Sequence, residues 1–336
     1  MTVLWIAGGT GTFGHAFTPA ALASGIYEKV IIFSRDEDKQ FRMRNLLGDD
    51  PRLRWHIGDV RDRDRLLLSL RGVDVGVFAA ALKHVPSGES NPEEHIKTNI
   101  LGALNVARAA QDCGVKKLLA ISSDKAVEPI NLYGATKMCM EKALIAYNAL
   151  SRTRISVVRY GNVLGSRGSF IETLERLQKE GAKTFQLRSV ESTRFWMEAK
   201  DAARFVLERI KDMRGEEVFV PKLPSSTALS FARRYLPDAT PEIVGIPRGE
   251  KIHETLISSE EWQYTDDLGT HFRILPNGQR HAPPHGMAKY TSNDNQFNPR
   301  DAADDRGDGF GALKLGDPQF VPDGRELLRD LREEAR

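Results

Sequence analysis

Short apolar segments recur along the first half of the chain and alternate with segments of helical spacing. The apolar segments are rich in Val, Ile and Leu and lack polar–apolar alternation, which is typical of parallel strands buried on both faces. They lie at Val3–Ala7, Lys29–Ser34, Leu53–Ile57, Val73–Ala79, Lys117–Ser122 and Ile155–Tyr160. Between them, two helices are predicted at Glu94–Cys113, with Ile96, Ile100, Leu104 and Ala107 on one face, and at Tyr133–Leu150. This alternation predicts an α/β fold with a doubly wound parallel sheet.

The pattern loosens after Gly161. Helical spacing remains at Phe170–Lys179 and Asp201–Met213, and strand-like pieces occur at Glu217–Pro221 and Glu242–Ile246. From Pro276 onward, glycine and proline increase and apolar periodicity nearly vanishes until Leu327. We therefore expect a nucleotide-binding domain over 1–160, an interleaved, smaller substrate lobe over 161–276, and an extended tail over 277–336 that ends in a short helix.

Composition narrows the functional class. The 336 residues carry 48 Lys and Arg against 46 Asp and Glu, a net charge of +2, which argues against a protein that mainly binds nucleic acid. The arginine-rich stretch Arg52–Arg71 contains interleaved aspartates, as in a solvated helix. Two cysteines, Cys113 and Cys139, allow neither a disulfide framework nor a zinc site. No apolar run approaches a membrane span, and we expect a cytoplasmic protein without metal or membrane association.

A glycine-rich loop follows the first predicted strand. Gly8, Gly11 and Gly14 lie in AGGTGTFG, before a predicted helix, with Thr12 and Phe13 between them. Glycines let the backbone turn tightly and approach a pyrophosphate, whose charge the helix N-terminus favours. A tight turn without a ligand is the alternative, but the strand, loop and helix together favour a dinucleotide site.

The second strand ends in Ser34 and Arg35, where an NAD site usually carries an acid for the ribose hydroxyls. A hydroxyl and a guanidinium suit the 2′-phosphate of NADP. Asp36 follows at once, so NAD remains open, as does a merely superficial Arg35. Farther along the chain, Asp59 and Val60 are expected beside the adenine, and the small residues Ala79–Ala81 beside the passing cofactor.

Tyr133 and Lys137 form a Y-x-x-x-K pair after the fifth strand. Residues four apart share a helix face, and a nearby ammonium favours the phenolate form of a tyrosine. Such a tyrosine can take the proton of an alcohol as hydride leaves its carbon. The pair is common by chance, and its position directly after a strand is what gives it meaning.

Ser123, Asp124 and Lys125 stand at the end of that fifth strand. A sugar epimerase needs only a hydroxyl at this place, so the added acid and amine indicate a second step, an elimination. Asp124 could protonate a departing hydroxyl, and Lys125 could remove a proton next to a ketone. The alternative is a solvated ion pair, which the neighbouring Tyr133 and Lys137 make less attractive.

Several blocks of the chain together resemble the soluble, inverting UDP-N-acetylglucosamine 4,6-dehydratases, extended short-chain dehydrogenase/reductases that act first in pseudaminic acid biosynthesis. The resemblance runs from Val3 to about Pro276. The blocks are GGTGTFG, FSRDEDKQ, IGDVRD, AAALKHVP, KTNILGA, SSDKAVEPINLYGATK, VVRYGNVLGSRGS, STRFWM and GEKIHETLIS.

The resemblance implies a Rossmann-like fold, a tightly bound NADP, UDP-N-acetylglucosamine as substrate, and a homo-oligomer. It implies catalytic roles for Ser123, Asp124, Lys125, Tyr133 and Lys137. Through its blocks it adds Lys39 and Ala80 to the cofactor site beside Gly8, Gly11, Thr12, Phe13, Gly14, Ser34, Arg35, Asp36, Asp59, Val60 and Ala79. The implied substrate residues are Lys83, Asn99, Asn162, Val163, Gly165, Ser166, Arg167, Thr193, Arg248 and Glu250.

The chain departs from the family pattern at two places that bear on the site. Ser123 replaces the usual threonine and keeps the hydroxyl. The usual I-R-P-G-E-K reads Ile246 to Lys251 with proline and arginine exchanged, which re-aims Arg248, the residue expected to meet the nucleotide phosphates. Related membrane-anchored dehydratases, which retain the C5 configuration, usually carry methionine in place of Tyr133.

The expected reaction is a 4,6-dehydration with internal hydride return and inversion at C5, a hydro-lyase reaction. Tyr133 takes the proton of the C4 hydroxyl, Lys125 removes the C5 proton, and Asp124 helps the C6 hydroxyl to leave. Two alternatives stay open: a nucleotide-sugar 4-epimerase or dehydrogenase, and a non-catalytic NADP-binding protein of the same fold.

Overall fold

The computed structural model describes residues 2–165, 170–276, 278, 286 and 288–295. One nine-stranded sheet has the order β14-β15-β10-β6-β5-β4-β1-β2-β3. Strands β14 (Thr265–Asp267) and β15 (His271–Ile274) join its edge antiparallel to their neighbours, whereas the other strands are parallel. The doubly wound parallel sheet predicted from the sequence is confirmed. The parallel strands are β1 (Val3–Ala7), β2 (Lys29–Ser34), β3 (Leu53–Ile57), β4 (Val75–Phe78), β5 (Lys117–Ile121), β6 (Arg154–Val158) and β10 (Val218–Pro221).

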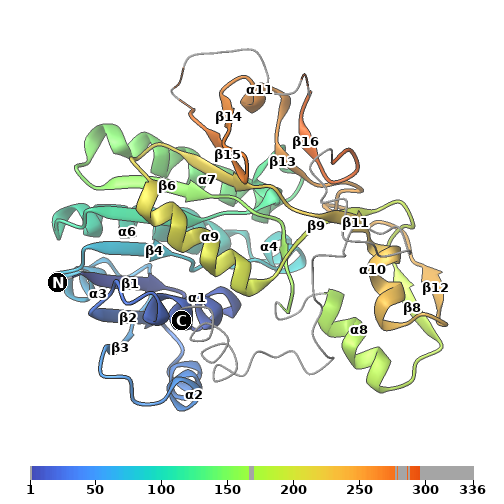
Figure 1. The fold of residues 1–336 in the computed structure, drawn as a ribbon, viewed down its shortest axis with the longest axis horizontal. Coiled ribbons are helices and arrows are strands. Elements are labelled where there is room, and N and C mark those ends of the chain that lie inside the picture. The colour runs from blue at the N-terminus through green and yellow to red at the C-terminus, as the bar shows by residue number, and fades with distance from the viewer. Residues whose placement is uncertain (1, 166–169, 277, 279–285, 287, 296–336) are drawn as a thin grey trace.

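Helices cover both faces of the sheet (Figure 1). Helices α1 (Thr12–Ala23) and α9 (Ala199–Asp212) pack against each other, and α6 (Gly102–Asp112) contacts both α3 (Arg63–Ser69) and α7 (Leu132–Tyr147). Each crossover buries apolar side chains on the sheet, so β1, β4 and β5 are almost wholly buried. The other helical elements of this part are α2 (Glu37–Leu47), α4 (Val85–Ser90), α5 (Pro92–His95), the 3₁₀ turns η2 (Asp124–Ala126) and η3 (Asn148–Leu150), and α11 (Ser259–Trp262).

A smaller lobe lies beyond the carboxyl ends of the parallel strands (Figure 1). It has its own apolar core, in which Trp196 stacks on Phe231 with ring centroids 4.2 Å apart. Chain segments distant in sequence build this lobe and its link to the sheet. They are β7 (Asn162–Val163), α8 (Phe170–Lys179), β8 (Thr184–Leu187), β9 (Thr193–Met197), β11 (Ser225–Thr227), α10 (Ala228–Tyr235) and β12 (Thr240–Ile243).

A further two-stranded pair joins β13 (Thr255–Ile257) to β16 (Tyr290–Thr291). Tyr290 is fully buried, and its hydroxyl accepts a hydrogen bond from the Leu223 amide. Part of the expected tail is thus packed into the body, while 296–336, with the expected C-terminal helix, lies outside the described residues. The domain boundaries at 160 and 276 stay a prediction.

The predicted face of the helix at 94–113 is wrong only at its start. Ala107 is buried and Ile100 and Leu104 are half-buried, but Ile96 is exposed, whereas Thr98 and Asn99 are buried. A π-helical segment, η1 (Ile96–Leu101), precedes α6, and its wider turn departs from the α-helical spacing on which the prediction relied. In the part of the chain that the structure describes, no helix combines the length and the apolar character that crossing a bilayer requires.

A buried arginine at the end of β6 joins three parts of the fold. Arg159 is 2% exposed, and its guanidinium donates to the carboxylates of Glu141 on α7 and Glu261 on α11, and to the Leu256 carbonyl of β13. Burial alone would raise the pKa of Glu261, but the Arg159 charge lowers it to about 2. The cation is therefore fully compensated, and the β13–α11 segment is fixed to the sheet.

We expect Arg159→Met to lower the free energy of unfolding by about 3–5 kcal/mol, because two carboxylates lose their buried partner. Urea denaturation at pH 7 measures this loss. Arg42→Met, at an exposed pair with Asp38, is the matched control and should change stability by less than about 1 kcal/mol. Because the folded pKa of Glu261 is depressed, the wild-type advantage should shrink as pH falls from 4.5 toward 2. An advantage that persists at pH 2 would contradict this assignment.

Candidate active site

A cavity of about 1230 Å³ lies between the carboxyl ends of the parallel strands and the small lobe. Open α/β sheets bind ligands at this edge because the loops after their parallel strands converge there. The wall includes the loops after β1, β4, β5 and β6 on one side, and α8 and β8 on the other. One cavity is thus long enough to hold a dinucleotide and a second ligand next to each other.

The loop after β1 is shaped for a closely approaching group. Gly8 has φ +73°, and a Cβ atom on it would lie 2.8 Å from the Ala80 backbone. A Cβ on Gly14 would lie 2.0 Å from the Gly9 carbonyl oxygen, so only glycine fits there. Helix α1 starts after Gly11 without a side-chain cap, which leaves its first amides available to an anion. Gly8, Gly11, Thr12 and Phe13 line the cavity, and this cradle fits a pyrophosphate.

The residues predicted at the adenosine end lie outside the cavity wall. The Ser34 hydroxyl accepts a hydrogen bond from Gln40. The half-exposed Arg35 side chain has Nη1 3.8 Å from Oδ2 of Asp59. Asp36 caps α2 by accepting from the Lys39 amide, and their side chains pair at 2.7 Å. Val60 is buried, so a ligand there would meet mainly Arg35 and Asp59.

The loop after β4 lines the cavity, and a buried asparagine holds this loop in place. Ala79 and Lys83 line the cavity. Asn99, predicted as a substrate residue, is fully buried instead: its side chain bonds both the amide and the carbonyl of Leu82 and also the Thr136 hydroxyl. It therefore holds the loop that carries Lys83 and is not itself part of the wall.

Tyr133 and Lys137 both line the cavity from the first turns of α7. Asn131 caps this helix by accepting from the Gly134 amide at 2.7 Å. A Cβ on Gly134 would lie 2.1 Å from the Lys125 carbonyl, so glycine lets the start of α7 press against the turn after β5. Burial raises the pKa of Tyr133, an effect that the Lys125 charge and the Ser123 hydrogen bond partly offset. Burial lowers the pKa of Lys137 to about 8, and its amine donates to the Ile121 carbonyl.

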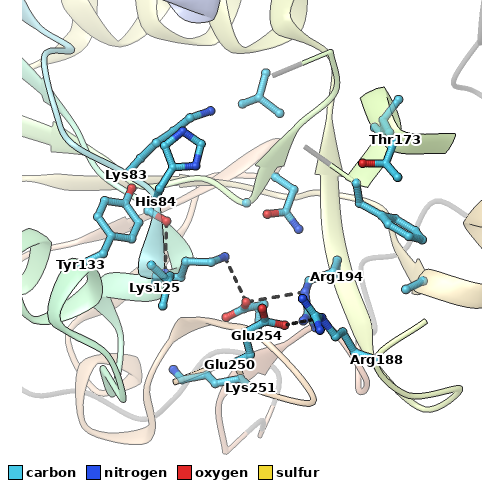
Figure 2. Close-up of a pocket in the computed structure, with 18 of the residues that line it drawn as sticks. Lys83, His84, Lys125, Tyr133, Thr173, Arg188, Arg194, Glu250, Lys251 and Glu254 are labelled. Atoms are coloured by element: carbon cyan, nitrogen blue, oxygen red, sulfur yellow. Dashed lines mark hydrogen bonds and ion pairs between the residues drawn. The ribbon is translucent and has the colours of Figure 1, made fainter. Parts of the chain in front are cut away.

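Lys125 lies between two buried carboxylates, Asp124 and Glu254, and Figure 2 shows its contact with Glu254. Its Nζ is 3.2 Å from Oδ1 of Asp124 and 3.0 Å from Oε1 of Glu254. Burial alone would lower the pKa of Lys125, but the two carboxylates raise it above its usual range. Burial raises the pKa of Asp124. The amine therefore carries a proton in this structure, next to an acid that accepts one readily.

Asp124 does not line the cavity, whereas Ser123 and Lys125 do. It is 1% exposed, and its Oδ1 accepts from the Ser123 hydroxyl at 2.7 Å. Direct proton donation from Asp124 to a ligand, as expected from the sequence, is therefore revised. Two residues of the cavity wall, Ser123 and Lys125, hydrogen-bond to Oδ1 of Asp124.

The predicted substrate residues of the lobe divide into two groups. Asn162, Val163 and Glu250 line the cavity. Thr193 does not: its hydroxyl lies 2.9 Å from Nδ1 of His253 and 2.6 Å from Oγ of Ser292. Arg248 is exposed and also lies outside the wall. Gly165 has φ +70° beside the wall, while Ser166 and Arg167 lie outside the described residues.

Several charged wall residues were not singled out from the sequence. Arg194 has its Nε 3.7 Å from Oε1 of Glu254, and Arg188 lies 3.9 Å from Glu250 (Figure 2). Lys251 also lines the cavity and donates to the Val127 carbonyl. A single acid or base in an irregular segment has no periodic signal, so only the fold reveals these positions. Across the described ranges, no group of three or more His, Cys, Asp or Glu could hold a metal ion.

The chain is similar to sugar-nucleotide enzymes. UDP-N-acetylglucosamine 4,6-dehydratase (inverting) of Campylobacter jejuni subsp. jejuni serotype O:2 is 42% identical over 330 residues, covering 96% of this chain and 95% of that protein. UDP-glucose 4-epimerase of Rickettsia conorii is 42% identical over 286 residues, covering 82% of this chain and 83% of that protein.

Solved structures share the fold. Pen from Bacillus thuringiensis is 32% identical with a TM-score of 0.80, covering 88% of this chain and 93% of that one. DesIV, a dTDP-glucose 4,6-dehydratase from Streptomyces venezuelae solved with NAD bound, is 22% identical with a TM-score of 0.69, covering 75% of this chain and 87% of that one. This second likeness bears on the fold alone.

A family model described as polysaccharide biosynthesis protein matches residues 4–276. The match spans most of the chain and includes the glycine loop, the turn after β5 and the start of α7. The chain therefore belongs to the polysaccharide biosynthesis protein family, alongside the inverting UDP-N-acetylglucosamine 4,6-dehydratases to which it is 42–44% identical.

Proposed function

We propose that the protein is a UDP-N-acetylglucosamine 4,6-dehydratase that inverts C5 and uses NADP. The observation that carries the proposal is Lys125, held at the cavity wall between Asp124 and Glu254 and next to Tyr133. Relatives of that name at 42–44% identity support it. The product, a 4-keto-6-deoxy sugar with the L-arabino configuration, would enter pseudaminic acid-type nucleotide-sugar biosynthesis.

The cofactor is proposed to lie along the loop after β1. Gly8, Gly11 and the first amides of α1 would hold its pyrophosphate, and Arg35 would meet a 2′-phosphate. When bound, NADP would supply the hydride chemistry, as acceptor for the hydride of C4 and as its donor at C6. The chain's own groups supply position and proton transfer.

Tyr133 is proposed to remove the proton of the C4 hydroxyl. Burial keeps it a phenol, so it needs nearby positive charge to become a phenolate. Lys137 and Lys125 both line the same cavity and supply that charge. As the C4 oxygen gives up its proton to Tyr133, its carbon becomes a ketone and the C5 proton becomes acidic.

The Lys125–Asp124 pair, which shares one proton, is proposed to carry out the elimination. Lys125 passes its proton to Asp124 over 3.2 Å and then, as a free amine, takes the C5 proton. One proton of the regenerated ammonium goes to the C6 hydroxyl, which leaves as water, and Asp124 returns its own to the amine. Tyr133 gives C5 its new proton on the opposite face, which inverts that centre.

An epimerase is the second candidate, because Rickettsia relatives at 40–42% identity have that name. Epimerisation at C4 needs no base for C5, so it would give no role to the Lys125 amine at the cavity wall and its two carboxylates. A dehydrogenase would accumulate reduced cofactor in proportion to product, whereas the proposed cycle would not. A non-catalytic protein would bind NADP without turnover.

The stereochemistry and the roles of Lys125 and Tyr133 are tested together. In deuterated water, the first product from UDP-N-acetylglucosamine should carry deuterium at an inverted C5, observed by proton NMR before slower epimerisation. Lys125→Ala should lower turnover at least about 100-fold, because no base reaches C5, yet bind NADP normally. Tyr133→Phe should stop the first oxidation.

Lys142→Ala, at an exposed position of α7, is the control and should turn over at the wild-type rate. Retention at C5 would refute the stereochemical proposal. Full dehydration by Lys125→Ala would refute the elimination mechanism.

Cofactor preference rests on Arg35. Arg35→Ala should weaken NADP binding about tenfold to a hundredfold, because a charge-assisted hydrogen bond to the 2′-phosphate is lost. NAD lacks that phosphate, so its affinity should change less than about threefold. Calorimetry with both cofactors measures the difference, and Arg42→Ala on the exposed side of α2 is the control. Equal losses for the two cofactors would overturn the NADP assignment.

A further inference from the structure

Glu254 is a buried carboxylate that the proposed reaction leaves without a role. It is 2% exposed and lies just before β13, at the cavity wall. Its Oε1 contacts the Lys125 amine at 3.0 Å and Nε of Arg194 at 3.7 Å, whereas Oε2 is buried and has no hydrogen-bond partner among the described residues. Holding such a group away from water is costly unless its charge is used.

Ser292 fixes the backbone of Glu254 from beyond the end of the family match at residue 276. The Glu254 amide donates to the Ser292 hydroxyl at 2.9 Å, and the Ser292 amide donates to the Glu254 carbonyl at 2.9 Å. The same hydroxyl lies 2.6 Å from the Thr193 hydroxyl. The segment after 276 therefore reaches the wall of the active site and holds the residue that faces Lys125.

We propose that Glu254 and Ser292 are a pair of positioning residues that keep the Lys125 amine at the cavity wall in the place where it works. The proposal rests on the proposed function and deepens it. The Glu254 carboxylate holds Nζ of Lys125 at the cavity wall through their ion pair. Ser292 fixes the position of that carboxylate through its hydrogen bonds with the Glu254 backbone. Neither residue needs to touch the substrate.

The charges around Lys125 make the carboxylate of Glu254 important. The carboxylates of Asp124 and Glu254 lie next to the Lys125 amine, and two further cations, Arg194 and Lys251, lie near the same cluster. Tyr133 is a neutral neighbour. The Glu128 carboxylate interacts with Lys251 from outside this cluster. Without the Glu254 charge, the cluster would contain one carboxylate, that of Asp124, and the three cations Lys125, Arg194 and Lys251. The proton that Lys125 shares with Asp124 would then be lost at lower pH.

Glu254→Gln keeps the shape of the side chain and removes its charge. We expect kcat to fall about 100-fold, because the reacting amine is displaced, with KM changed less than about threefold. The alkaline limb of the kcat profile should move to lower pH. Above that limb the pair has lost its shared proton, so Asp124 stays charged and holds back the ammonium proton that the C6 hydroxyl needs. Glu254→Asp should restore the limb, because the charge returns, while kcat stays below wild type.

Ser292→Ala tests the position of the Glu254 carboxylate without changing its charge. It leaves the Glu254 carboxylate ionised, so kcat should fall about tenfold while the alkaline limb stays in place. Asn295→Ala is the same-segment control, because Asn295 bonds Leu223 and Ser225 rather than Glu254. Glu93→Gln, at an exposed carboxylate, is the control for the acid-to-amide change. Both controls should behave as wild type.

A readout independent of turnover keeps the proposal testable if the proposed function fails. The Cε resonance of Lys125 in ¹³C-lysine-labelled protein, assigned with Lys125→Arg, should titrate at lower pH in Glu254→Gln than in wild type. No product from UDP-N-acetylglucosamine with the wild-type protein would overturn the proposed function alone. An unchanged Lys125 titration, or wild-type kcat and pH profile in well-folded Glu254→Gln, would overturn this inference.

Discussion

Two cations at the ends of neighbouring strands, the half-buried Lys125 and the buried Arg159, fix the arrangement of this molecule. Lys125 follows β5 and Arg159 follows β6, and neither charge can stay in a low-dielectric interior without compensation. Glu254 and Glu261 supply half of that compensation, from either side of β13. One short segment, from Glu254 to Glu261, thus supplies a carboxylate to each cation. The C-terminal part of the chain must therefore lie against the edge of the sheet where the cavity opens. The need to pair buried charge therefore connects the fold to the site.

The parallel sheet explains why the remaining groups converge. The loops after β1, β4 and β5 end at one edge, so the glycine cradle, Lys83 and Lys125 meet there although they are far apart in sequence. The small lobe closes the other side with α8 and β8. The residues proposed to transfer protons follow strands of the sheet, and the small lobe faces them across the cavity.

Much of this could be predicted from the sequence because its signals are local. The runs of β-branched residues predicted β1, β2 and β3 to the residue, and the glycine loop and Tyr133–Lys137 spacing predicted wall residues. Failures came where tertiary contacts decide. The π-helical segment before α6 leaves the predicted Ile96 exposed, the Thr193 hydroxyl faces Ser292, and Asp124 lies behind Lys125. Glu254 had no local signal, since its meaning depends on a partner 129 residues away.

The two carboxylates that contact Lys125 differ from those that contact Arg159 in how their oxygens are hydrogen-bonded. Oδ2 of Asp124 and Oε2 of Glu254 are buried acceptors without partners among the described residues, and such a group costs about 1–3 kcal/mol. Each belongs to a carboxylate that contacts Lys125 through its other oxygen. A stabilising ion pair would be cheaper with those oxygens satisfied, as the Arg159 guanidinium is between Glu141 and Glu261. The two cations therefore differ: Arg159 has fully paired carboxylates and holds the fold together, whereas the carboxylates around Lys125 keep one acceptor each free within the described part of the chain, which suits the proton transfer proposed for that pair.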